Sequence, residues 1–258
     1  MVKNRSVEMY ALTVPLEAVK KLSNEQRFAY YMLGHMFNEL MCLQKLVSFS
    51  LPKHDDRRPA RLRPELGQAM FLFRLASGKI WEAGKAIRER KQLAVTLHQD
   101  VLPRMPNGKQ RLKDLNAAIN AAQWLSPLRN GIGFHFPTFE HWSRHIIPDE
   151  SWVDDTVFLS SQSGNTYYDA ADTLAQAFMF QQYGVTNLKE AIDPLIGQMI
   201  DLLGTTNSFL EDALGIFISE VILDGSVTRE PAGTVLAPIF ENVSTPFWTA
   251  MPAKHPLQ

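Results

Sequence analysis

The stretch EQRFAYYMLGHMFNELMCLQKLVSF, residues 25–49, predicts a long amphipathic helix. Its apolar side chains recur every three or four positions, which is the spacing of one helical face. Ser23 or Asn24 can cap the helix, and Leu51-Pro52 ends it. The face consists of Phe28, Met32, Met36, Leu40, Leu43 and Val47.

The same periodicity predicts further helices along the chain. Pro64 at a first helical position opens a second long helix, with an apolar stripe from Leu66 to Val101 and a break near Gly78 or Gly84. A third helix runs from about Lys109 to Leu128. Helical spacing returns in residues 168–183, 187–204 and 206–223, where Gly184 and Gly204 are suitable helix stops.

These elements predict an all-α fold, a bundle of about six helices with a long irregular insertion after the third. We expect an N-terminal arm over 1–21, a single helical domain over 22–224 and an irregular C-terminal tail over 225–258. Residues 9–14 read as a β stretch or an extended arm, and residues 157–159 as a brief strand.

Composition bounds the class of protein. Of the 258 residues, 45% are hydrophobic and 21% charged, as in globular proteins. No run of 18 apolar residues predicts a membrane span, and the first residues do not resemble a secretory signal. Cys42, the single cysteine, cannot form an internal disulfide and is expected to be a small buried hydrophobe. These features favour the cytoplasm.

Charge is divided unevenly along the chain. Residues 1–130 hold 22 Lys and Arg against 11 Asp and Glu, whereas residues 131–258 hold 4 against 16. A positive field in the first half can attract phosphates even though the net charge is −1. Alternatively, the acidic half covers the basic half, meets it in a neighbouring subunit, or both halves are solvated surfaces.

The segment Arg129-Asn130-Gly131-Ile132-Gly133-Phe134-His135 interrupts the helical pattern. An arginine, a polar residue directly after it, and a histidine after five intervening residues make this segment resemble the motif of the HEPN superfamily. The order of helices over about 22–183 is also similar to that family.

The resemblance implies a metal-independent endoribonuclease that needs no cofactor and acts as a homodimer, with two motifs meeting at one composite site. His135 would exchange a proton with the ribose 2′-hydroxyl or the leaving oxygen. Arg129 would stabilise phosphate charge, and Asn130 would orient His135 or bind the phosphate. The products would carry 2′,3′-cyclic phosphates. The family's habits suggest a toxin or defence role, with a protein partner such as an antitoxin.

Two other interpretations of this region stay open. Gly131 and Gly133 disfavour regular helix, so Arg129 can instead cap the carbonyl end of its helix while His135 packs among aromatic residues. A histidine cluster also allows a metal site, although no metalloprotease pattern is present. Its members are His135, Glu140, His141 and His145.

Two further groups can support an RNA-directed site. His35 and Glu39 lie four residues apart in the first helix, where a carboxylate can orient a histidine. A basic loop over 52–63 can follow a phosphate backbone. It contains Lys53, His54, Arg57, Arg58, Arg61 and Arg63. Both groups are more simply explained as solvated surface, with His35 and Glu39 forming a pair within one helix.

The leading hypothesis is therefore a HEPN-like endoribonuclease or RNA-binding protein. A non-catalytic helical module for protein interaction is the alternative, and a metal-dependent hydrolase that uses the histidine cluster comes third. The interaction module would use the same bundle and the same charge division for partner contacts.

Overall fold

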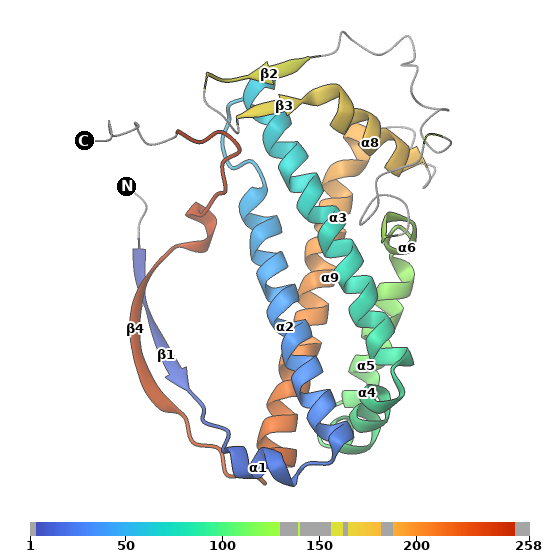
Figure 1. Cartoon of the computed structure of the whole chain (residues 1–258), viewed down its shortest axis with the longest axis vertical. Coiled ribbons are helices and arrows are strands. Elements are labelled where there is room, and N and C mark those ends of the chain that lie inside the picture. Colours follow the sequence, from blue (N-terminus) through green and yellow to red (C-terminus); the bar gives the residue numbers. More distant parts are fainter. Residues whose placement is uncertain (1–3, 130–138, 140–155, 162–164, 182–187, 251–258) are drawn as a thin grey trace, which may run out of the picture.

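Three long helices form the centre of the molecule and run side by side (Figure 1). They are α2 (Asn24–Ser50), α3 (Pro59–Glu89) and α9 (Leu188–Ile216). The computed structural model describes residues 4–129, 139, 156–161, 165–181 and 188–250. The predicted fold class, a mostly helical bundle, is confirmed.

Shorter elements surround these three helices. A π-helical turn, Leu97–Val101, follows α4, and another, Phe217–Ile222, follows α9. The other helices are α1 (Leu16–Lys21), α4 (Lys91–Thr96), α5 (Gly108–Ala121), α6 (Leu125–Leu128) and α8 (Asp169–Gln181), with a 3-10 turn at Phe240–Asn242.

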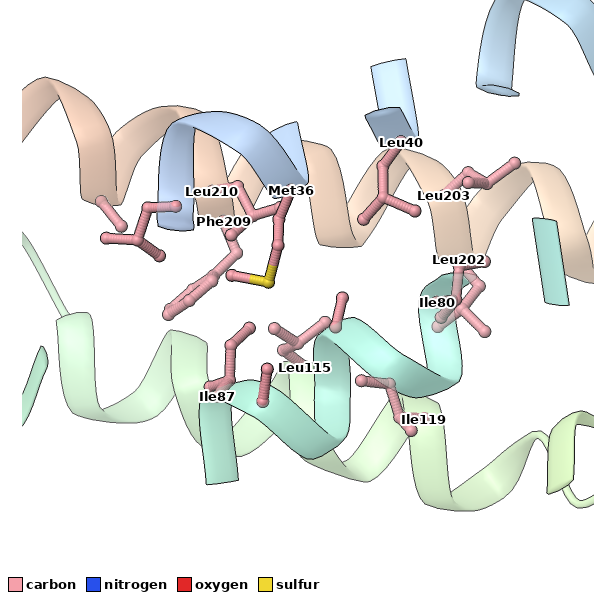
Figure 2. Close-up of a cluster of buried hydrophobic side chains, with 14 of the residues drawn as sticks. Met36, Leu40, Ile80, Ile87, Leu115, Ile119, Leu202, Leu203, Phe209 and Leu210 are labelled. Atoms are coloured by element: carbon pink, nitrogen blue, oxygen red, sulfur yellow. The ribbon is translucent and has the colours of Figure 1, made fainter. Parts of the chain in front are cut away.

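The core lies between α2, α3, α5 and α9. Figure 2 shows aliphatic and aromatic side chains from these helices pointing toward one another. Burying each such side chain contributes roughly 1.5–3 kcal/mol, so this interface supplies the main stabilisation of the fold. The labelled members are Met36, Leu40, Ile80, Ile87, Leu115, Ile119, Leu202, Leu203, Phe209 and Leu210.

Helix α2 begins and ends where the sequence predicts. Ser23 caps it in a reciprocal pair with Gln26, in which each side chain bonds the other residue's backbone N–H. The predicted apolar face is correct from Met36 onward. At the first turns, however, Phe28 is exposed and Ala29 and Leu33 are buried instead, so the face there is rotated by one position.

Helix α3 starts earlier than predicted, because Pro59 and not Pro64 occupies its first turn. Arg61 and Arg63 are therefore helical and not part of a loop. Pro64 has no N–H for the carbonyl of Ala60 four residues before it. The indole Nε1 of Trp248 donates to that carbonyl at 2.8 Å, which satisfies the oxygen that the proline leaves without a helical partner.

The predicted break near Gly78 or Gly84 does not occur, since α3 continues to Glu89. A Cβ added at Gly84 would lie 2.8 Å from Cδ1 of Ile119. The glycine thus allows α5 to approach α3 and does not end the helix.

The later helices also differ from the prediction. The third helix ends at Ala121, and α6 is a separate short turn. Helix α9 continues through Gly204, which we expected to end a helix. Leu202, Leu203 and Thr206 are buried around this glycine, and their packing outweighs the roughly 1 kcal/mol that a helical glycine costs. Gly184 lies outside the described residues.

A two-stranded ribbon is the main departure from an all-α fold. β1 (Asn4–Ala11) pairs antiparallel with β4 (Glu230–Pro238), and the register shifts between Met9 and Tyr10. Only residues 9–11 of the β stretch expected at 9–14 are strand, and the expected N-terminal arm over 1–21 also contains helix α1. The expected irregular tail is wrong over 230–238. The ribbon lies along one side of the bundle (Figure 1), and nearly all its residues are exposed.

Residues after the ribbon are irregular apart from the 3-10 turn, as expected for the tail, and they pack against the bundle up to Thr249. Lys53 Nζ donates to the Val243 carbonyl at 2.8 Å, and Gln68 Nε2 to the Thr245 carbonyl at 2.9 Å. Thr249 exchanges two hydrogen bonds with Asn165. Residues 243–249, called the anchored segment below, cover one end of the bundle.

That end also carries a small hairpin. The predicted strand at 157–159 is confirmed as β2 (Val157–Leu159), and it pairs with β3 (Thr166–Tyr168). In the part of the chain that the structure describes, no helix combines the length and apolarity needed to span a bilayer.

Candidate functional site

Arg129 lies at the carboxyl end of α6. Its backbone N–H bonds to the carbonyls of Leu125 and Ser126 as the last turn closes. Its Nη2 pairs with Oε1 of Glu82 on α3 at 2.7 Å, and both side chains are about two-fifths exposed. The ion pair places the guanidinium beside Glu82 on the surface of α3.

The two residues predicted to support the site line a pocket between α2 and α3. Glu39 accepts two hydrogen bonds from Lys79 Nζ at 2.9 Å, and Nε2 of His35 lies 3.7 Å from Oε2 of Glu39. The pocket has a volume of about 350 Å³ and includes Glu82 and Arg90 in its wall. We call it the mid-bundle pocket.

The mid-bundle pocket connects Arg129 with the predicted supporting pair. Lys79 and Glu82 are three residues apart on α3, so they occupy the same helical face. Lys79 holds Glu39 and Glu82 holds Arg129. The structure thus brings three of the predicted residues to one region, whereas Asn130 and His135 lie outside the described residues.

The four arginines predicted to bind RNA lie elsewhere. Arg57 and Arg58 precede α3, and Arg61 and Arg63 lie in its first turns. Because α3 rises 1.5 Å per residue, the 21 positions from Arg61 to Glu82 span about 30 Å. These arginines and the mid-bundle pocket are therefore separate places on the molecule.

Carboxylates engage three of these arginines. Arg58 and Arg61 both contact Asp56, and Arg63 pairs with Asp169. The hydrogen bond from Arg58 is the main reason that the pKa of Asp56 lies far below its usual value. Arg57 has no partner among the described residues, which leaves its charge available to an anion.

Sequence reasoning missed a partly buried pair beside these arginines. Nε2 of His54 lies 2.6 Å from Oε2 of Glu65, and the two side chains are 22% and 9% exposed. Arg61 Nε lies 3.5 Å from the other oxygen of Glu65. His54 was counted only as part of a basic loop, because a pairing across eleven residues and a turn has no local signature.

A second buried polar cluster holds α8 against α3. Burial, and then the neighbouring Asp172, raises the pKa of Tyr167 well above its usual value. Burial lowers the pKa of Arg74, and the nearby Asp172 opposes that shift. A Cβ at Gly67 would collide with the Tyr167 hydroxyl and Asp172. This glycine therefore allows the close approach of β3 and α8 to α3.

The division of charge is partly resolved inside the chain. Arg63 pairs with Asp169, and Arg111 pairs with Asp212, so acidic residues of the second half cover basic residues of the first at two places. Ion pairs within the chain thus account for part of the charge asymmetry.

Two other predictions from the sequence concern the cysteine and a metal site. Cys42 is exposed on α2, which corrects the expectation of a buried hydrophobe. Among the residues that the structure describes, no three His, Cys, Asp or Glu side chains are grouped to hold a metal ion. The histidine cluster of His135, Glu140, His141 and His145 lies outside those residues.

Comparisons with known proteins add no relative. The chain matches no protein-family model, and no curated protein or solved structure is significantly similar to it.

Proposed function

We propose that this protein is a HEPN-like, metal-independent endoribonuclease. Arg129, Asn130 and His135 form its catalytic group, and two copies of the chain form the working enzyme. A role as a toxin or in defence, with an antitoxin-like protein partner, follows from the same resemblance.

The observation that carries the proposal is the position of Arg129. Its guanidinium is tied to Glu82 at 2.7 Å yet remains about two-fifths exposed. A guanidinium that uses one N–H group for this pair keeps others for a phosphate. Lys79, Glu39 and His35 lie along the neighbouring mid-bundle pocket and provide further polar contacts.

The chemistry needs only a base, an acid and a cation. A histidine that titrates near neutral pH removes the proton of the ribose 2′-hydroxyl, and that oxygen attacks the adjacent phosphorus. The bond to the 5′-oxygen breaks, and the leaving oxygen takes up a proton. Arg129 stabilises the negative charge that develops on the phosphate.

The alternative function, a non-catalytic interaction module, is favoured by one observation. The β1–β4 ribbon exposes apolar side chains such as Met9, Val235 and Leu236 that the described bundle leaves uncovered. Exposed apolar surface of this kind is common at sites of protein contact.

A cleavage assay in EDTA tests the proposal. Wild-type protein, His135→Ala and Arg129→Ala are incubated with a labelled mixed-sequence RNA and a DNA of the same sequence. His98→Ala and Arg104→Ala are matched controls, because both residues are exposed and remote from the motif in the sequence.

We expect RNA cleavage with 2′,3′-cyclic phosphate ends, no DNA cleavage, and a loss of about 10² or more in both motif variants. The controls should retain wild-type rates. Equal activity in the motif variants and the controls would contradict the assignment, and a folded wild type that cleaves none of the RNAs would favour the interaction module.

A further inference from the structure

A cavity at one end of the bundle provides a second candidate site. Two pockets, of about 630 and 700 Å³, meet at Arg61, Glu65 and Pro246. The first lies between the start of α3, strand β2 and the anchored segment around Trp248. Each pocket is large enough for a small organic ligand.

One wall of the first pocket is cationic. Arg58 donates Nε and Nη2 to Asp56, and Arg61 donates Nη1 to Asp56 at 3.3 Å. Since a guanidinium carries five N–H groups, each arginine keeps donors for another anion. A phosphate can therefore bind the N–H groups that Asp56 does not use.

The other residues that line the first pocket are mostly apolar and include two aromatic rings. Phe158 of β2 and Trp248 both line the first pocket and are half-buried. The hydrogen bond from Trp248 to the Ala60 carbonyl holds the indole in place. Aromatic side chains positioned beside cationic groups are suited to stack on a nucleobase.

The buried carboxylate of Glu65 has a partner at each oxygen, which reduces its repulsion of an anion. His54 Nε2 contacts one oxygen and Arg61 Nε the other. Nδ1 of His54 is buried and has no partner among the described residues, although His54 lines the second pocket. A buried nitrogen without a partner costs stability.

We infer that the first pocket binds a nucleoside 5′-phosphate, with Arg58 and Arg61 on the phosphate and Phe158 and Trp248 on the base. The ligand is either a free nucleotide or the 5′-phosphorylated end of an RNA, which present the same chemical group. The site is independent of Arg129 and His135, so it stands even if the chain cleaves no RNA.

Calorimetric titration tests the inference. The probes are adenosine and uridine 5′-monophosphate, the two nucleosides, inorganic phosphate, and a 2′-O-methyl RNA hexamer with and without a 5′-phosphate. The methylated hexamer lacks the 2′-hydroxyl, so binding is measured without any cleavage.

We expect at least one monophosphate or the phosphorylated hexamer to bind about tenfold or more tightly than the nucleosides, phosphate or unphosphorylated hexamer. Tighter binding of the phosphorylated hexamer assigns the site to RNA ends, and tighter binding of the monophosphate assigns it to free nucleotides. Both results support the inference. Failure of every phosphorylated probe to bind the folded protein overturns it.

Two conservative variants localise the binding. Arg58→Gln changes an 80% exposed side chain, and Phe158→Leu keeps an apolar group, so both should fold. Each should weaken binding about tenfold or more, whereas Arg104→Gln should not change it. Unchanged affinity in both folded cavity variants would place the ligand elsewhere and refute the site.

Discussion

The helical centre and the β1–β4 ribbon are stabilised by different interactions. In the centre, large side chains such as Phe73 and Leu203 are almost completely buried. In the ribbon, Val7 is 47% and Leu236 is 73% exposed. The ribbon thus relies on backbone hydrogen bonds and cross-strand contacts, with little apolar burial.

The difference teaches that local stability can be supplied by anchors at the ends of an element. An isolated two-stranded sheet is marginal in water. Here α1 buries Val19 in the core at one end of the ribbon. At the other end, Lys53 and Gln68 bind the segment after β4. Fixing both ends lowers the entropy that the strands lose on pairing.

The strongest test compares one apolar deletion in each region. Phe73→Ala should lower the free energy of unfolding by about 3–5 kcal/mol, because it leaves a cavity in the core. Leu236→Ala should change it by less than about 0.5 kcal/mol, since the side chain is on the surface. Urea denaturation followed by circular dichroism measures both values, and equal losses would show that the ribbon is covered in solution.

Two glycine substitutions sharpen the comparison within the helices. Gly67→Ala should destabilise the protein by about 1–3 kcal/mol, because the added methyl group meets the Tyr167 hydroxyl and Asp172. At Gly34 an added Cβ meets nothing within 4 Å. Gly34→Ala should therefore stabilise the protein by about 0.5–1 kcal/mol. Thermal unfolding of both variants measures the shifts, and the same sign for both would contradict this geometry.

A third test compares the loss of a serine at a helix cap with the loss of a serine in a strand. Ser23→Ala loses the bond from the Gln26 N–H to the Ser23 hydroxyl, at 3.1 Å. The expected loss is about 1 kcal/mol. Ser6→Ala in β1 is the matched control, because Ser6 is exposed, and it should be nearly neutral. Chemical denaturation gives both values, and a neutral Ser23→Ala would show that the cap is unimportant.

The smallest expected effect on global stability comes from the ribbon itself. Gly233 has a φ of +112°, which disfavours any residue with a Cβ. Gly233→Ala should weaken the ribbon by about 1 kcal/mol while the midpoint of bundle unfolding stays within about 1 °C. Hydrogen exchange should show faster exchange in β1 and β4 than in wild type, with α3 unchanged. Thr234→Ala is the control, and amides of β1 and β4 should exchange more slowly in it than in Gly233→Ala. Equal exchange rates in the two variants would contradict the expectation.

Local signals explain which parts of the fold were predictable. Ser23 and Leu51-Pro52 are adjacent to the ends of α2, so its limits could be read directly. The start of α3 could not, because Pro64 is accommodated by Trp248, a residue distant in the sequence. The partner of β1 was also hidden, since its paired residues lie 219 to 234 positions away and no turn sequence joins the strands.

The candidate sites show the same limit. The sequence offered His35 and Glu39 as support for the motif from their spacing in one helix, and the structure places both near Arg129. Lys79 and Glu82 of α3 form the ion pairs with Glu39 and Arg129. A search for apolar periodicity in α3 does not identify these polar residues. The pairing of His54 with Glu65 depends on how a turn folds back onto α3, and no residue pattern specifies that turn.

The pairing of β1 with β4 also constrains the order of events during protein synthesis. At roughly 5–20 residues per second, β1 leaves the ribosome on the order of ten seconds to a minute before β4. Throughout that interval its alternating side chains, including Val7 and Met9, have no strand beside them. A nascent chain with an unpaired strand can associate with other chains, so yield in cells should depend on chaperones that bind the first segment until the last strand arrives.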